Sequence, residues 1–441
     1  MNEPGVINYL RMYLHSPSGQ RVPIGYASQF GDAMRMSFDE DYINNPNRLT
    51  LSMLYTGASD DDTRKILLSQ RDERLVRNDG RWPTFLQNLL PEGYNRERLA
   101  LKRGCDEDNE FELLAAAGHD LMGALEVEPT PRDEEIPKVV RHWHVAQGLD
   151  VLEPGFVEMP VEDGFSLPGV VTKFSAIHDG RRYVVKRHSA AGSHIIKLPS
   201  TKHPDLALNE FMGYQLCDSV GLQCASAELA TPQDVELPEQ VDFETVLVVQ
   251  RFDRDGDRRI HMEEFAQALG LAPKHKYGKV MLQDFGQMLR LINERSARPV
   301  LDVTEFLGRL VAFILMGNTD AHLKNWALRY EDGIQPTLSP LYDPVCVSSF
   351  FAGQPLNTYA QNRAIDKTLC AFGWDGFEEL IRRAGLQRVT YHIRLCRDLV
   401  RNAQATWPAL MDAFPTPPAM RLEIMERLSG KVAIAAMGKH A

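Results

Sequence analysis

Short apolar runs alternate with turn residues over the first 60 residues of the chain. Proline, glycine, asparagine and aspartate separate these runs, as they do between short strands. The pattern predicts a small β-rich subdomain of hairpins at the N-terminus. The four runs span 6–15, 21–30, 33–39 and 48–55.

Helical patterns follow this β-rich region. Residues 85–104 place leucines and Phe85 between arginines and lysines, and residues 111–118 form an apolar run that ends near a glycine. A short strand is expected after it. Residues 127–165 are rich in proline and acidic side chains, which is typical of a linker, so we expect a domain boundary near residue 150.

The middle of the chain has the pattern of an α/β lobe. Two β-branched strand candidates, 181–187 and 193–199, are separated by a turn of small residues. A helix is predicted over 206–220, because apolar residues recur there at helical spacing. Two further strand candidates span 225–230 and 246–252.

From residue 256 the chain is mostly helical by pattern, apart from one hairpin over 325–343 that turns at Asp332–Gly333. The predicted fold class is α+β: a small β-rich N-terminal domain precedes a two-lobed core whose C-terminal lobe is mostly helical. A cleft between two such lobes is a favoured place for a ligand. We place the domains at 1–150, 151–255 and 256–441.

Charge and cysteine content narrow the function classes. The 441 residues carry 49 basic and 60 acidic side chains, so the net charge is −11, which disfavours a protein that binds DNA alone. None of the six cysteines forms a CxxC pair, so neither a zinc site nor a disulfide framework is indicated. The sequence has no run of roughly 20 apolar residues and no secretory signal pattern. We therefore expect a cytoplasmic protein without a membrane span.

The strongest chemical signal is a set of polar residues that follows a very apolar helix. Asn325 follows Asp320 by five positions, and Asp343 comes 18 positions later, beyond the hairpin. Phosphotransferases use one carboxylate for the proton of the acceptor hydroxyl, and an amide and a second carboxylate for magnesium. The same Asp-to-Asn spacing occurs in the protein-kinase catalytic loop. The alternative is that these residues only cap turns.

Four further side chains extend this signal. His322 could orient Asp320 or a phosphate, and Lys324 could contact the transferred phosphate. A lysine within an apolar strand needs a partner, so Lys197 is expected to hold ATP phosphates and to pair with Glu210 on the next helix. The alternative for Lys197 and Glu210 is an exposed lysine and an exposed glutamate.

Two weaker signals concern the nucleotide. The strand that ends at Gln250 could be a hinge, with main-chain groups of Gln250 and Phe252 on the adenine edge and Asp253 on a ribose hydroxyl. A charged turn after a strand is the common alternative. No phosphate-binding P-loop motif exists, and the candidate phosphate-covering loop is 173–185, with Ser175 near the phosphates.

With these residues assembled, the sequence resembles the HipA family of bacterial serine/threonine kinases, which act as toxins of toxin–antitoxin modules. The segments FLQNLLPEG and FELLAAAGHDLMGALEVEP look like the family's N-terminal domain. The segments HIIKLP, NEF, RFDR, TDAHLKN and YDP match its kinase core in the same order, and the resemblance spans essentially the whole chain.

The resemblance implies a role for each matching residue. It makes Asp320 the catalytic aspartate, Asn325 and Asp343 the magnesium ligands, and Lys197 the lysine on the ATP phosphates. Residues 250–253 and Tyr342 of the YDP motif are then expected beside the adenosine, with Glu210 paired to Lys197. Ser175 falls near the serine that the family autophosphorylates, although the glycine and glutamine usual after that serine are absent.

The resemblance also implies partners. The expected activity is that of a non-specific, ATP- and Mg²⁺-dependent serine/threonine protein kinase that arrests growth by phosphorylating a translation component, such as an aminoacyl-tRNA synthetase. The expected partner is a small helix-turn-helix antitoxin like HipB, through which alone the chain would reach DNA. The alternatives are a catalytically weak nucleotide-binding co-repressor, suggested by the irregular 174–182 segment, and a kinase of small molecules.

Overall fold

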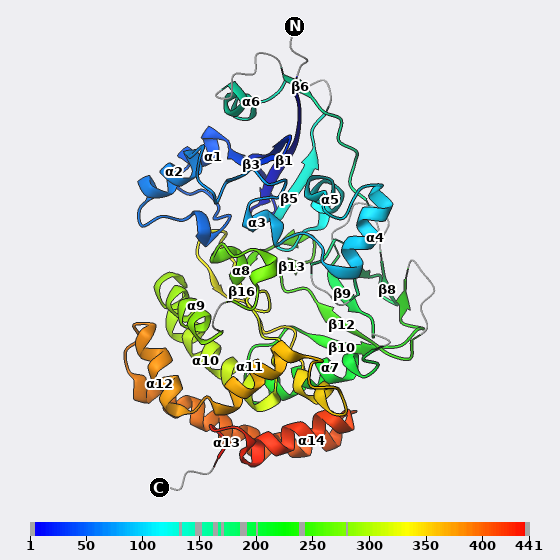
Figure 1. Cartoon of the computed structure of the whole chain (residues 1–441), viewed down its shortest axis with the longest axis vertical. Helices are drawn as coiled ribbons and strands as arrows, with labels where there is room; N and C mark the ends of the chain where they lie inside the picture. The colour runs from blue at the N-terminus through cyan, green and yellow to red at the C-terminus, as the bar shows by residue number, and fades with distance from the viewer. Residues whose placement is uncertain are drawn as a thin grey trace.

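The computed structural model arranges the chain as three units along its longest axis, from a β-rich N-terminal end to a helical C-terminal end (Figure 1). We call their described residues the N-terminal unit (5–161), the middle unit (166–255) and the helical unit (256–436). This arrangement confirms the predicted fold class. The structure describes residues 5–131, 135–145, 152–161, 166–168, 172–185, 192–199, 202–237, 243–278 and 281–436.

The N-terminal unit is built on a six-stranded sheet in the order β4-β3-β2-β1-β5, with β6 paired to β1. Alternate residues of its long first strand, such as Leu10, Met12 and Leu14, are buried under the helices of the unit. The strands are β1 Gly5–His15, β2 Arg21–Phe30, β3 Ala33–Phe38, β4 Val76–Arg77, β5 Leu125–Pro129 and β6 Leu152–Pro154. The helices are α1 Glu40–Asn44, η1 Met53–Tyr55, α2 Asp60–Leu68, α3 Thr84–Gln87, α4 Gly93–Arg103, α5 Glu110–Ala117, η2 Gly118–Asp120 and α6 Lys138–Val145.

Two expectations for this unit need correction. Residues 48–55 form no strand: they lead into the short 3₁₀ helix η1. Glu263 accepts the N–H of Met53, which removes a donor that a sheet would need, and it also accepts the hydroxyl of Ser52. The expected linker over 127–165 is partly ordered structure. It contains α6 and β6, and β6 runs parallel to β1.

The middle unit contains a second six-stranded sheet, in the order β10-β12-β9-β7-β8-β11, with one long helix against it. Residues 173–178, expected as a loop, form the strand β7, which is antiparallel to β9. The expected small-residue turn at 188–191 lies outside the described residues. The elements are β7 Lys173–His178, β8 Tyr183–Val184, β9 His194–Lys197, α7 Leu206–Ser219, β10 Ala227–Ala230, β11 Val235–Glu236, β12 Val246–Gln250 and β13 Arg254–Asp255.

The helical unit surrounds α10, whose side chains from Phe306 onward are all buried. The predicted hairpin is present as β16 and β17. The strands are β14 Arg258–Arg259, β15 His261–Glu264, β16 Ala327–Tyr330 and β17 Thr337–Leu338. The helices are α8 Phe265–Ala268, η3 Pro273–His275, α9 Met281–Arg295, α10 Pro299–Met316, η4 Val347–Phe351, α11 Ala360–Ala371, α12 Trp374–Arg383, α13 Val389–Ala413, α14 Pro418–Glu426 and the π-turn η5 Arg427–Lys431.

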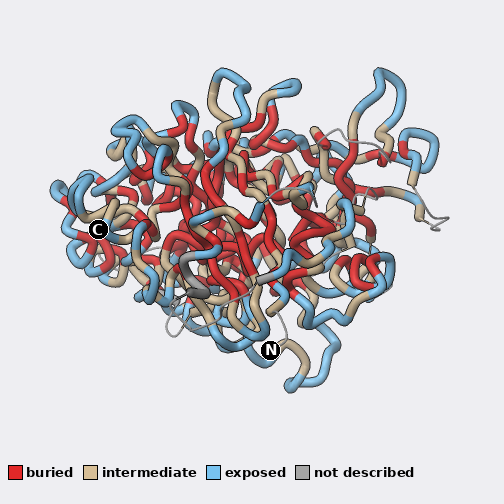
Figure 2. Tube along the Cα trace, turned by 90° about the horizontal axis from the view of Figure 1, so that it is seen from above, coloured by how far each residue is buried: buried red, intermediate tan, exposed pale blue. Residues whose placement is uncertain are grey.

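Buried segments run through the middle of the molecule, and exposed loops form its rim (Figure 2). The largest hydrophobic cluster packs α7 against α10 and α13, and so joins the middle unit to the helical unit. Among the described helices, none has both the length and the apolar composition to cross a bilayer.

Candidate active site

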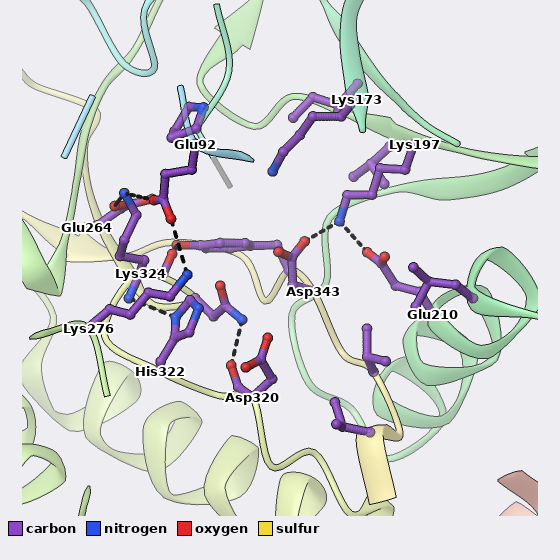
Figure 3. Close-up of a pocket in the computed structure, with 18 of the residues that line it drawn as sticks. Glu92, Lys173, Lys197, Glu210, Glu264, Lys276, Asp320, His322, Lys324 and Asp343 are labelled. Atoms are coloured by element: carbon purple, nitrogen blue, oxygen red, sulfur yellow. Dashed lines mark hydrogen bonds and ion pairs between the residues drawn. The ribbon is translucent and has the colours of Figure 1, made fainter. Parts of the chain in front are cut away.

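A cavity of about 430 Å³ lies where the three units meet (Figure 3). All the residues expected at the site except Ser175 line it, together with others that the sequence did not single out. The N-terminal unit contributes Glu92 and Met122 to the wall, and the other two units contribute the rest. The polar lining residues used below are Glu92, Lys173, Lys197, Glu210, Gln250, Asp253, Glu264, Lys276, Tyr277, Asp320, His322, Lys324, Asn325, Tyr342 and Asp343.

Lys197 projects from β9 into the cavity and makes two ion pairs. Its Nζ donates to Glu210 of α7 at 2.6 Å and also to the carboxylate of Asp343. Burial alone would lower the pKa of the Lys197 ammonium, but the two carboxylates outweigh burial and raise it above its usual value. The expected pair between Lys197 and Glu210 is therefore present, and the lysine is charged.

Asp343 is held in an unusual backbone conformation beside this lysine. Its φ of 55° lies in the left-handed region, which costs energy for a residue other than glycine and is often found at functional sites. The N–H of Asp343 donates to the hydroxyl of Tyr214 at 3.2 Å. The backbone after Asp343 packs closely against α7 at Gly213. A side chain would not fit there, because a Cβ at Gly213 would lie 1.7 Å from the carbonyl oxygen of Pro344.

The catalytic loop begins where α10 ends. Gly317 closes the helix in the left-handed conformation, and Asn318 then accepts the N–H of Asp320 at 3.1 Å. The hydroxyl of Tyr277 donates to the Asp320 carboxylate. The side-chain amide of Asn325 donates to the Asp320 carbonyl at 2.8 Å, which leaves the Asn325 side-chain oxygen without a donor among the described residues.

His322 belongs to this loop and its ring is neutral. Burial lowers its pKa to about 4, so the imidazole is uncharged at neutral pH. Its ring is edge-on to that of Tyr277, with 5.1 Å between the ring centroids. His322 can therefore orient the loop, but it supplies no positive charge for a phosphate.

Lys324 does not face the phosphate position as expected. Its ammonium is 4% exposed and lies between three oxygens: it donates to the carbonyl of Asn88 at 2.9 Å and pairs with Glu92 at 2.8 Å and Glu264 at 3.3 Å. Burial lowers the pKa of Lys324, but the two carboxylates raise it above the usual value. Because the Lys324 side chain is buried and its charge is already balanced by two carboxylates, the expected phosphate contact is not supported.

Two aromatic rings mark the expected adenosine end. Phe252 and Tyr342 lie 5.6 Å apart with a 40° tilt, and the Tyr342 hydroxyl donates to the Lys324 carbonyl. The N–H of Gln250 donates to Ser226 at 2.8 Å, so this donor is not available to an adenine. The N–H of Phe252 has no acceptor among the described residues, so it is available to donate.

Asp253 is not placed to bind a ribose. It is 3% exposed, and both of its carboxylate oxygens accept hydrogen bonds: Arg251 at 2.8 and 3.0 Å, Arg254 at 2.8 Å and the N–H of Gly123 at 2.7 Å. Burial alone would raise the pKa of Asp253, but the two arginines lower it well below its usual range. Asp253 instead joins the end of β12 to the N-terminal unit.

Ser175 lies in strand β7 and not in a loop over the phosphates. It is 4% exposed, and its hydroxyl donates to the carboxylate of Asp120. The same carboxylate pairs with Arg251 at 2.9 Å and Arg254 at 3.0 Å. Phosphorylation of Ser175 would require β7 to leave this position, and it stays a prediction from the resemblance.

Five site residues were missed by the sequence analysis: Glu92, Lys173, Glu264, Lys276 and Tyr277. Lys173 is the cross-strand neighbour of Lys197, and its side chain points into the cavity (Figure 3). Its ammonium has no hydrogen-bond or ion-pair partner among the described residues, and burial lowers its pKa. No pattern in the sequence gives the register of β7 on β9, so nothing there brings Lys173 beside Lys197.

The residues expected to hold magnesium fit that ion. Mg²⁺ prefers oxygen ligands, usually one or two carboxylates together with phosphate oxygens and water. Asp343 offers a carboxylate, and Asn325 offers an amide oxygen that no described donor uses. Asp343 also shares the cavity with the two strand lysines, which suit the phosphates of a nucleotide.

Comparisons with known proteins point to one family. A family profile described as HipA N-terminal domain matches residues 18–128, and one described as HipA-like C-terminal domain matches residues 165–407. The chain is 33% identical over 385 residues to the putative kinase Y4dM of Sinorhizobium fredii, which covers 86% of this chain and 87% of the relative.

Two more distant comparisons involve Shewanella oneidensis. The chain is 27% identical to its serine/threonine-protein kinase toxin HipA, over 60% of this chain and 63% of the relative. The solved complex of the S. oneidensis toxin–antitoxin proteins HipA and HipB with operator DNA contains a chain that aligns with a TM-score of 0.64, over 96% of both chains. At 20% identity, this match shows that the fold is shared.

Proposed function

The chain belongs to the HipA family, and we propose that it is a serine/threonine protein kinase that uses ATP and Mg²⁺. The observation that carries the proposal is the convergence in one cavity of Lys197, Asp320 and Asp343, which come from two units and lie far apart in the sequence. Their chemistry matches the three tasks of phosphate transfer: holding phosphates, receiving a proton and holding magnesium.

The nucleotide is bound by groups at both ends of the cavity. Adenine lies by Phe252 and Tyr342, where the N–H of Phe252 can meet its edge. The ammonium groups of Lys173 and Lys197 face the phosphates. Asn325 and Asp343 would hold Mg²⁺, which when bound neutralises phosphate charge and fixes phosphate geometry.

Asp320 receives the proton of the acceptor hydroxyl. The hydroxyl oxygen bonds to the γ-phosphorus, the bond from that phosphorus to the β–γ bridging oxygen breaks, and ADP leaves. Tyr277 and Asn318 fix the aspartate beforehand, one through its carboxylate and the other through its N–H. Such positioning supplies most of the catalysis in phosphate transfer.

The biological role follows the named relatives. We infer that the protein acts as a growth-arresting toxin on a translation component, with an aminoacyl-tRNA synthetase as the first candidate substrate. Its partner is a HipB-like helix-turn-helix antitoxin, which supplies the contact with DNA. The similarity to a HipA kinase toxin and to the fold of the HipA–HipB–DNA complex supports this role.

Two variants test the kinase proposal. Asp320→Asn and Asp343→Asn should each abolish transfer of labelled phosphate from ATP to protein while leaving the unfolding midpoint near that of the wild type. Asp375→Asn, at an exposed carboxylate outside the cavity, is the control and should keep full transfer. Undiminished transfer by both site variants would exclude the proposal.

The structure removes the reason for considering the co-repressor alternative. It rested on an irregular segment over 174–182, and most of that segment lies in the strand β7. Nucleotide binding without transfer to any protein in a lysate would still restore it.

A further inference from the structure

Glu92 brings the N-terminal unit into the active site. It lies between α3 and α4 and reaches into the cavity toward two lysines of the helical unit (Figure 3). Its carboxylate pairs with Lys324 at 2.8 Å and with Lys276 at 3.2 Å. Its side chain is 19% exposed, so these lysines meet a carboxylate that water only partly screens.

The two lysines stand on the two segments that carry Asp320 and its hydrogen-bond partner. Lys324 belongs to the catalytic loop itself, four residues after Asp320. Lys276 directly precedes Tyr277, whose hydroxyl donates to the Asp320 carboxylate. The two segments also touch each other, because the N–H of Leu323 donates to the Lys276 carbonyl at 3.0 Å.

Most hydrogen bonds and ion pairs of the Lys276 and Lys324 ammonium groups go to residues outside the helical unit. Lys324 has one carboxylate of the helical unit, Glu264 at 3.3 Å, and its two shorter contacts go to Asn88 and Glu92 of the N-terminal unit. Lys276 pairs with no described carboxylate except Glu92. Without the Glu92 charge, Lys276 would have no carboxylate partner among the described residues, and Lys324 would keep only Glu264.

We propose that Glu92 is a positioning residue for phosphate transfer, through which the N-terminal unit holds Asp320 in its working orientation. The path runs from Glu92 to Lys276, to the adjoining Tyr277 and then to the Asp320 carboxylate. The active site is thus completed by a unit that contributes no reacting group. This inference rests on the proposed kinase function.

The test compares full-length variants with the wild type. Glu92→Gln keeps the side chain's shape and removes its charge, and Glu92→Asp keeps the charge. Glu112→Gln is the matched control, because Glu112 forms an ion pair of the same length, 2.8 Å to Arg103, within the N-terminal unit and outside the cavity. Each variant is assayed for phosphate transfer from ATP, for ADP affinity by calorimetry and for its unfolding midpoint.

Glu92→Gln should lower kcat by about 10- to 100-fold and change KM for ATP and the ADP affinity by no more than about twofold, as expected for the loss of a residue that orients a catalytic group. Glu92→Asp should recover part of kcat, and Glu112→Gln should keep all of it. Lys276→Met should lower kcat too, and adding Glu92→Gln to it should cost little more, since both changes break one path.

Three outcomes would overturn the proposal. They are an unchanged kcat in Glu92→Gln, a loss of kcat that tracks loss of folded protein or of ADP binding, and full additivity of Glu92→Gln with Lys276→Met. Failure of the kinase proposal looks different, because the wild type itself would then transfer no phosphate.

Discussion

Partners decide what each lysine of the cavity can do. Lys197 and Lys324 are both buried and both ion-paired, but Lys197 faces Asp343 whereas Lys324 faces carboxylates at the cavity's inner wall. Lys173 has no partner among the described residues. Residue type and spacing predicted a phosphate-binding role for Lys324, and only the positions of Glu92 and Glu264 show why this role is not supported.

Lys324→Met should destabilise the fold. It would leave Glu92 and Glu264 in the wall without the cation between them, and removing one partner of a buried pair costs about 3–5 kcal/mol. Urea unfolding measures the loss. If Lys324 served only the transferred phosphate, stability would stay the same and transfer alone would fall.

Lys173→Met should weaken nucleotide binding without lowering stability. The substitution removes a half-buried ammonium that has no partner in the described structure, so the folded state loses no ion pair. We expect ATP affinity to fall about tenfold, equivalent to about 1.4 kcal/mol. Calorimetric titration with ATP, alongside urea unfolding, checks both parts. Unaltered ATP affinity would remove Lys173 from the phosphate site.

At the scale of helices and strands, the sequence predicted the long segments with regular apolar spacing. The predictions were wrong where a segment's hydrogen-bond partners come from another unit. The pattern predicted α7, the mostly helical region after residue 256 and the β16–β17 hairpin, because their apolar spacing reflects burial against neighbours in the same region. It misjudged residues 48–55, whose hydrogen bonds go to Glu263, more than 200 positions away. Likewise, the ribose role of Asp253 is not supported because two residues of the N-terminal unit occupy its surroundings: Asp120 also accepts from Arg251, and the N–H of Gly123 donates to the Asp253 carboxylate.

Glu263 should make stability depend on pH. It is fully buried, where burial raises the pKa of its carboxyl to about 7 although Ser52, Tyr330 and Met53 donate hydrogen bonds to it. A raised pKa means that the folded state holds the proton longer. Protonated Glu263 therefore contributes its full share to the free energy of unfolding below about pH 4.5, the pKa of a glutamate in the unfolded chain. This share is lost as the pH rises through 7, the pKa in the folded state.

The measurement is the unfolding free energy of the wild type and of Glu263→Gln between pH 5 and 8. The wild type should lose up to about 3 kcal/mol more than the variant over this range, since one pKa unit corresponds to about 1.4 kcal/mol. The histidines titrate in both proteins, so their effect cancels in the difference between the two unfolding free energies. Parallel curves would show that the Glu263 carboxyl does not titrate there.

At the scale of the whole molecule, three units together build the proposed kinase site. The net charge of −11 excluded little at first, but carboxylates prove to be concentrated at the site, where Glu92, Glu210, Glu264 and Asp343 set the positions of the lysines. The sequence could indicate Asp320, Asn325 and Asp343, since they are close together or lie at a known spacing. It could not indicate Glu92, because nothing in the order of residues shows that its segment enters the cavity.

The most direct test of the central claim is phosphosite mapping in host lysate, incubated with ATP and Mg²⁺ and either the wild type or Asp320→Asn. We expect new phosphoserine or phosphothreonine sites in the lysate with the wild type, and none of these sites with the variant. The same sites at the same occupancy with both proteins, or no new site with the wild type, would contradict it.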